Sequence, residues 1–108
     1  MEKKIFVVVL RYLVDIETIN AARASHLEFL KQHYDTGVFF CSGRQNSGNG
    51  GVILAHSENR KILLDILHQD PFYTKNLAEF QVFDFTPHNV SKNFSQFMET
   101  LRPLPNKR

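Results

Sequence analysis

The chain has only one cysteine and no tryptophan, and neither sign of charge predominates among its 108 residues. Because Cys41 stands alone, an intrachain disulfide is excluded, which fits a reducing compartment. Thirteen basic residues face eleven acidic ones, so the formal net charge is +2. Three of the basic residues fall within 102–108, so the remainder offers no strongly basic surface for nucleic acid.

Long hydrophobic runs are also missing. The apolar run that starts at Ile5 is interrupted by Arg11, which makes it far too short to cross a bilayer. Asp15 and Glu17 follow closely, and no small-x-small cleavage site comes after the run, so it does not fit a secretory signal peptide. We therefore interpret it as a core strand and expect a cytoplasmic protein that has no membrane partner.

The apolar periodicity predicts six main elements. Strands are expected at 5–13, 38–43, 51–56 and 78–86, and helices at 15–34 and 58–68. This βαββαβ order predicts an α+β, ferredoxin-like fold, with a four-stranded antiparallel sheet and both helices on one face. Residues 1–90 would form this domain. Residues 91–108 would form a tail with one short helix, dispensable for the core.

The first strand is apolar on both faces. Ile5, Val7 and Val9 point one way, and residues 6, 8 and 10 point the other. Such a strand is covered on both sides, but two helices can cover only one face of the sheet. An open apolar sheet face indicates an interface. The sequence therefore predicts a homodimer packed through its sheets.

The helix expected from Asp15 to Tyr34 carries a cation where a core residue belongs. Asp15 is a suitable N-cap, and Gly37 follows the end of the helix. Arg23 falls near the middle of the apolar stripe, and a buried cation needs an acidic partner. We expect Asp70 to be that partner, with Asp84 as the second choice.

His26 lies on the flank of the same stripe and is the candidate acid–base group. If the two helices are neighbours, Asp70 also approaches His26, and a carboxylate beside an imidazole fixes its tautomer and raises its basicity. Such a pair can transfer protons near neutral pH. Residue types alone favour a different interpretation, in which Asp70 only caps the turn before Pro71 and His26 fills a helix groove.

Other chemistries have weaker signals. His26 and His33 could share a helix face, but no third residue is spaced to complete a zinc site, so no metal is expected. Gly48 to Gly51 lacks the Gly-Lys-Ser/Thr and the helix of a phosphate loop, and is interpreted as a hairpin tip. Cys41, in a predicted strand without basic neighbours, is interpreted as an inert core thiol.

The chain resembles the YCII-related (YciI-like) family over about residues 5–87. The resemblance rests on the order and spacing of five motifs: Arg23-x-x-His26-Leu27, Gly37, Ser42-Gly43, Asp70-Pro71-Phe72, and Leu77-Ala-Glu-Phe-x-Val-Phe-Asp-Phe-Thr-Pro87. One departure concerns the second strand, which the family commonly follows with Gly-Pro. Here Gly43 precedes Arg44.

The resemblance implies a subunit of a dimeric α+β barrel with an active site at His26 and Asp70. Substrate contacts would come from Arg23, Ser42 and Gly43. The Tyr73 hydroxyl is a further candidate, with packing as its alternative role. Relatives include small isomerases, dehydrochlorinases and monooxygenases, many of which need no metal, so we expect no cofactor.

Two functions remain open from the sequence. The first is a cofactor-independent enzyme that uses a His–Asp dyad for isomerisation or elimination on a small organic acid or phenol-like compound. The second is a non-catalytic dimeric module that binds a small molecule or has a structural role.

Overall fold

The computed structural model describes residues 4–101. Its strands are β1 (Lys4–Tyr12), β2 (Phe39–Arg44), β3 (Gly50–Ser57) and β4 (Ala78–Phe85). Its helices are α1 (Ile16–Ala21), α2 (Arg23–Asp35), α3 (Arg60–Leu67), α4 (Pro71–Thr74) and α5 (Lys92–Thr100). None of the helices in this part of the chain is both long enough and apolar enough to span a bilayer.

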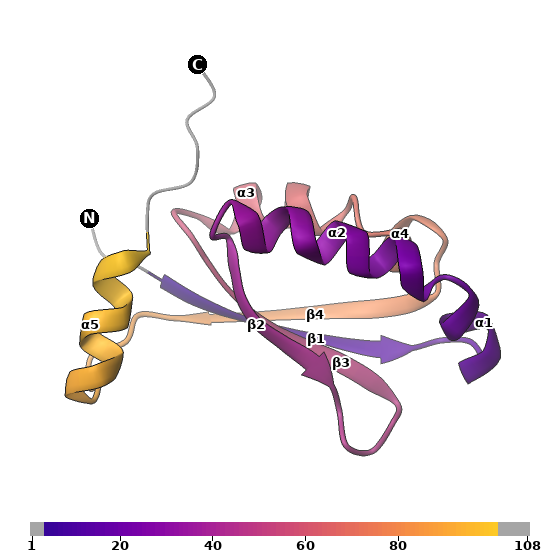
Figure 1. Ribbon diagram of the computed structural model, residues 1–108, viewed down its shortest axis with the longest axis horizontal. Helices are drawn as coiled ribbons and strands as arrows, with labels where there is room; N and C mark the ends of the chain where they lie inside the picture. The colour runs from indigo at the N-terminus through magenta and orange to yellow at the C-terminus, as the bar shows by residue number, and fades with distance from the viewer. Residues whose placement is uncertain (1–3, 102–108) are drawn as a thin grey trace.

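The strands form one sheet in the order β2-β3-β1-β4, and every neighbouring pair is antiparallel. Helices α2, α3 and α4 lie along one face of this sheet, while α1 and α5 lie at opposite ends (Figure 1). This arrangement confirms the predicted α+β, ferredoxin-like fold.

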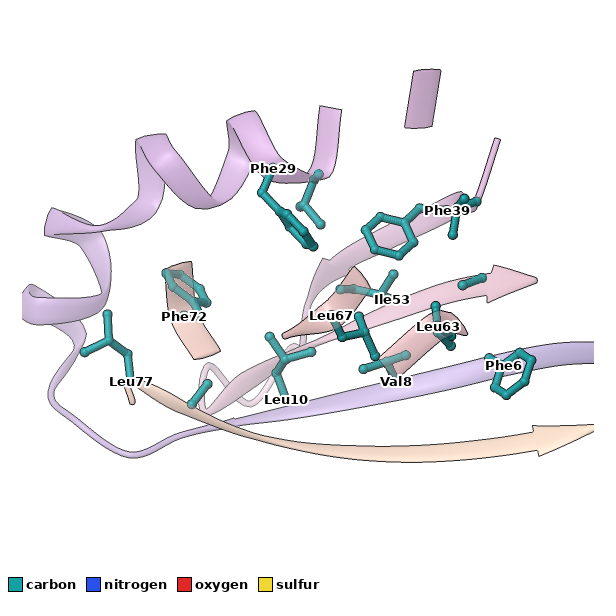
Figure 2. Packing of buried hydrophobic residues seen from close by; sticks show 14 of the residues in the cluster. Phe6, Val8, Leu10, Phe29, Phe39, Ile53, Leu63, Leu67, Phe72 and Leu77 are labelled. Carbon is teal, nitrogen blue, oxygen red and sulfur yellow. The ribbon is translucent and has the colours of Figure 1, made fainter. Parts of the chain in front are cut away.

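The core fills the space between the sheet and its helix layer. From β1, Phe6, Val8 and Leu10 point into this layer, where Leu63 and Leu67 of α3 meet them (Figure 2). All five side chains are almost completely buried. Removing so much apolar surface from water is the main stabilising term for a domain of this size.

The opposite face of the sheet is apolar and open. Val7 and Val9 of β1 lie on it, and Val7 is paired in register with Phe83 of β4. Phe83 and Phe85 are 50% and 51% exposed. The structure thus places these apolar side chains on the side of the sheet that α2, α3 and α4 leave uncovered.

The helix expected from Asp15 to Tyr34 is two helices, which corrects the prediction. Asp15 caps the first one, because its Oδ1 accepts the Thr18 N–H at 2.9 Å. Ala22, with φ −98° and ψ 3°, then interrupts the helix without any glycine or proline. The change of direction rotates α2 relative to α1, so one helical wheel cannot describe both. On α2, Phe29 and Leu30 face the core.

The second predicted helix also differs at both ends. Asn59 caps α3, one residue inside the predicted range of 58–68, because the Asn59 side chain accepts the Ile62 N–H at 2.9 Å. Ser57 donates to the Asn59 carbonyl oxygen. After α3, Pro71 begins the short helix α4, which the sequence prediction missed. Proline suits this first helical position because its missing N–H needs no partner there.

Two further expectations concern the sheet edge and the tail. Cys41 is exposed, so its interpretation as a core thiol was wrong. Helix α5 packs Phe97 against Phe40 of β2, with ring centroids 5.2 Å apart, and Leu101 is buried. Whether residues 1–90 fold without the tail stays a prediction, and 102–108 lie outside the described residues.

Candidate active site

His26 and Asp70 meet where α2 passes the start of α4. The His26 Nδ1 lies 2.9 Å from the Asp70 Oδ1, and the same oxygen accepts the Phe72 N–H at 2.9 Å. Asp70 is completely buried, while the His26 side chain is 12% exposed. Asp70 therefore caps α4 and binds His26, so the two interpretations left open by the sequence describe one arrangement.

The Asp-Pro-Phe sequence explains why this carboxylate sits so deep. Asp70 has extended backbone angles and serves as N-cap, Pro71 opens the single turn of α4, and Phe72 enters the core. A capping carboxylate must remain beside the first N–H groups of its helix. Because Phe72 is anchored, Asp70 is anchored with it.

Phe72 also fixes the orientation of the imidazole. The rings of His26 and Phe72 are stacked, with centroids 3.9 Å apart and an angle of 2° between their planes. An ionised carboxylate can only accept hydrogen bonds, so Nδ1 of His26 must donate to it. Nε2 is then the nitrogen of the neutral ring that carries a lone pair.

His26 lines a cavity of about 200 Å³ between α2 and the sheet. The polar or ionisable groups around it are His26, Arg23, Tyr12, Ser42 and Arg44, with Gly43 beside them. The other lining residues are apolar: Leu10, Leu27, Leu30, Val52, Ile53 and Phe72, with Gly51. An apolar pocket with a few convergent polar groups is typical of a small-molecule site.

Hydrogen bonds hold several of these polar groups in place. The Tyr34 hydroxyl and the Ser42 hydroxyl are hydrogen-bonded to each other. Arg44 Nε donates to the Tyr12 hydroxyl at 3.3 Å, and its Nη2 donates to the Asn20 Oδ1 at 3.3 Å. The cavity wall is therefore partly ordered by the protein itself.

Four of the candidate residues line this cavity, namely His26, Arg23, Ser42 and Gly43. Asp70 lies behind His26. Tyr73 does not reach the cavity: its ring stacks on His68, with centroids 4.3 Å apart, and meets Phe80 edge-on. On the single turn of α4, consecutive side chains point in different directions, so burying Phe72 turns Tyr73 away.

The expected role of Arg23 as a buried cation was wrong. Arg23 is exposed, and no hydrogen bond or ion pair joins it to another side chain within residues 4–101. Its first-choice partner, Asp70, binds His26 instead. Its second choice, Asp84, lies 3.3 Å from Arg60. The break at Ala22 explains this outcome, because it moves Arg23 out of the buried stripe.

Among the lining residues that were not predicted as site residues, three contact the polar groups of the site: Tyr12, Phe72 and Arg44. For Phe72, the available signal was its place two residues after the capping Asp70. For Arg44, it was the departure from Gly-Pro at this position. Tyr12 had no local signal, because its ring reaches the cavity only through the place of β1 in the folded sheet, where Tyr12 pairs with Ala78 of β4 and its N–H donates to the Asn49 carbonyl oxygen.

No group of three or more His, Cys, Asp or Glu side chains in the described residues could hold a metal ion. His33 packs its ring against Phe29 and Phe39, with centroids 4.8 and 5.3 Å away. Burial lowers the pKa of His33 below its ordinary value of 6.5. This histidine is therefore part of the packed layer under α2.

Comparison with solved structures places the fold among known ones. The structure of SnoaB, a cofactor-independent oxygenase from Streptomyces nogalater, superposes with a TM-score of 0.51 at 15% identity, covering 85% of this chain and 99% of that one. A mutant of the same enzyme gives a TM-score of 0.49 at 14% identity, with the same coverage. At such identities the likeness concerns the fold alone.

Family membership rests on the sequence match. No curated protein matches the chain. The model of the YCII-related domain matches residues 5–86, which is most of the chain and includes both His26 and Asp70. The chain therefore belongs to the family of YCII-related domains.

Proposed function

We propose that the chain is a small cofactor-independent enzyme in which His26 transfers a proton and Asp70 holds its ring. One observation carries the proposal: an imidazole that lines a cavity is hydrogen-bonded, at 2.9 Å, to a completely buried carboxylate. Buried carboxylates are rare unless they have a partner, and here the partner faces a ligand-sized space.

The geometry supports a general base at Nε2. When Nε2 takes a proton from a bound substrate, the ring becomes an imidazolium, and the carboxylate of Asp70 stabilises that charge through Nδ1. The stacked ring of Phe72 prevents the imidazole from turning away. The electron pair left on the substrate would be delocalised into a neighbouring carbonyl or aromatic ring.

Two reactions then fit this site. In an isomerisation, the proton returns to a different carbon of the substrate. In an elimination, a leaving group departs with the electron pair. A small organic acid or phenol-like compound suits the cavity of about 200 Å³. The likeness to SnoaB extends only to the fold and carries no reaction class over to this chain.

The test measures proton exchange, which does not require knowledge of the physiological product. Small keto acids and phenols would be incubated with the protein in D₂O, and loss of their C–H signals followed by ¹H NMR. We expect the wild-type chain to accelerate exchange on a member of this panel. His26→Gln should reduce the rate by about 100-fold or more, as for loss of a general base.

Asp70→Asn is the matched second variant, because its amide oxygen can still accept the Phe72 N–H while the charge is removed. It should also slow exchange. Exchange that survives in His26→Gln would contradict the proposal. A wild-type chain that binds panel members without exchanging their protons would favour the non-catalytic binding module instead.

We further propose that the chain is a homodimer that packs through its open sheet face. Half-exposed Phe83 and Phe85, with Val7 and Val9 beside them, form an apolar surface on a small domain. Such surfaces mark interfaces. A second copy is the proposed occupant, since the family resemblance implies a dimeric α+β barrel.

A further inference from the structure

The cavity beside His26 is positively charged. Arg23 and Arg44 both line it together with His26, whereas no aspartate or glutamate contributes to its lining. Asp70 carries the nearest negative charge described at His26, and it lies behind the imidazole with its Oδ1 already bound. A ligand in this cavity therefore meets two guanidinium groups that no acid of the cavity wall neutralises.

The four arginines in the described part of the chain fall into two groups, those that have an acidic partner and those that do not. Arg11 forms an ion pair with Glu79, and Arg60 forms one with Asp84. Neither Arg23 nor Arg44, the two at the cavity, pairs with a carboxylate within residues 4–101. The two arginines without an acidic partner are thus both at the candidate site, while the other two arginines are matched by acids.

Arg44 is oriented without being neutralised. Its Nε and Nη2 donate to the Tyr12 hydroxyl and the Asn20 Oδ1, both at 3.3 Å, and its guanidinium carbon lies 5.8 Å from the centre of the Tyr12 ring. All these partners are uncharged. A guanidinium has five N–H donors, so three remain, and both of those on Nη1 are among them.

We propose that Arg44 is a specificity residue that binds the carboxylate of a small substrate acid in the cavity beside His26. This inference rests on the proposed function and names its substrate class. The planar guanidinium can donate two parallel hydrogen bonds to a carboxylate. Arg23 adds a second positive charge, and the apolar side chains of Leu27, Leu30 and Ile53 contact the body of the acid.

The size of the cavity limits the acid. Sites for drug-sized ligands usually measure about 300–1,000 Å³, whereas this one is about 200 Å³. A single ring or a short chain with one carboxylate fits such a volume.

The test compares benzoate with benzamide, its uncharged analogue of almost equal shape. Each compound would be titrated into ¹⁵N-labelled protein, and the backbone amide signals of Ser42 and Gly43 followed by NMR. We expect saturable shifts with benzoate and binding at least about tenfold weaker with benzamide, since hydrogen bonds to charged groups carry that difference.

Arg44→Gln should weaken benzoate binding by about tenfold and leave benzamide binding unchanged. Arg44→Lys should retain part of the preference, because it keeps the charge but loses the planar fork. Arg60→Gln is the matched control, since it removes the same charge far from the cavity, and it should leave both affinities unchanged.

Four results would overturn the inference, and the first three are no saturable shift with benzoate, equal binding of benzoate and benzamide, and an unchanged preference in Arg44→Gln. Inorganic phosphate is the third probe, and phosphate binding as tight as benzoate with the same dependence on Arg44 would also overturn it. Benzoate binding that depends on Arg44 in a protein that fails the exchange assay would leave this inference standing and remove the proposed catalysis.

Discussion

A single carboxylate oxygen at Asp70 joins local structure to the candidate chemistry. Its Oδ1 accepts the Phe72 N–H, which starts α4, and also binds His26 Nδ1 on α2. Its other oxygen, Oδ2, is buried and has no hydrogen-bond partner among the described residues. Asparagine at this position would keep an acceptor oxygen and remove only the charge, so the helix cap can be separated from the charge beside His26.

Asp70→Ala should destabilise the fold more than Asp70→Asn. Alanine removes the helix cap, which is worth about 0.5–2 kcal/mol, whereas asparagine keeps an acceptor for the Phe72 N–H. Breaking a buried ion pair typically costs about 3–5 kcal/mol. We do not expect this cost from Arg23, because Arg23 is exposed and does not pair with Asp70. Urea unfolding of the three proteins measures both differences, and equal destabilisation would contradict the capping role.

At the scale of elements, one face of β1 packs against the helix layer and the other lies on the open side of the sheet. Val8 is completely buried against the helix layer, while Val9 lies on the open face in register with Gln81 of β4. Alternation along the strand predicted two apolar faces without deciding which one met the helices. The tertiary structure assigns residues 6, 8 and 10 to the helix side.

Val9→Asp should therefore dissociate the proposed dimer and leave the subunit folded. Val8→Asp should unfold it, because an unpaired charge in the core costs several kcal/mol. Sedimentation velocity measures association, and circular dichroism measures folding. Gln32→Glu, on the exposed side of α2, controls for the added negative charge. A Val9→Asp protein that sediments as the wild type does would count against the sheet-to-sheet dimer.

For the molecule as a whole, His33 links stability to pH. Both its ring nitrogens are buried without a hydrogen-bond partner among the described residues, and burial lowers its pKa from the ordinary 6.5. The unfolded chain therefore binds a proton more readily than the folded one. The free energy of unfolding that the neutral, buried His33 contributes is fully present above about pH 6.5 and is lost as the pH falls below that value.

His33→Phe should reduce this pH dependence, because phenylalanine binds no proton and suits a site between Phe29 and Phe39. Its free energy of unfolding should exceed that of the wild type at pH 5, by a margin that narrows at pH 8. Urea unfolding at both pH values and one protein concentration measures this difference. An equal margin at both pH values would assign the effect to packing alone.

The local sequence determined most of the helices and strands, together with the start of α1 at Asp15 and the end of α2 before Gly37. Short apolar runs bounded by turn residues predicted the four strands, Asp15 predicted a cap, and Gly37, whose φ is +87°, follows α2 as expected. The Asp-Pro-Phe motif fixed where Asp70 lies relative to Phe72. These features depend on residues a few positions apart, so they can be predicted from the periodicity and the turn residues of the chain.

Tertiary structure decided which side chains share the cavity. The interruption at Ala22 has no glycine or proline to announce it, yet it exposes Arg23 and sends Phe29 and Leu30 into the core. The same packing turns Tyr73 away and brings Tyr12 to Arg44 across 32 positions of sequence. Such contacts depend on how the helices pack against the sheet in a close-packed interior, and the pattern of neighbouring residues does not contain that information.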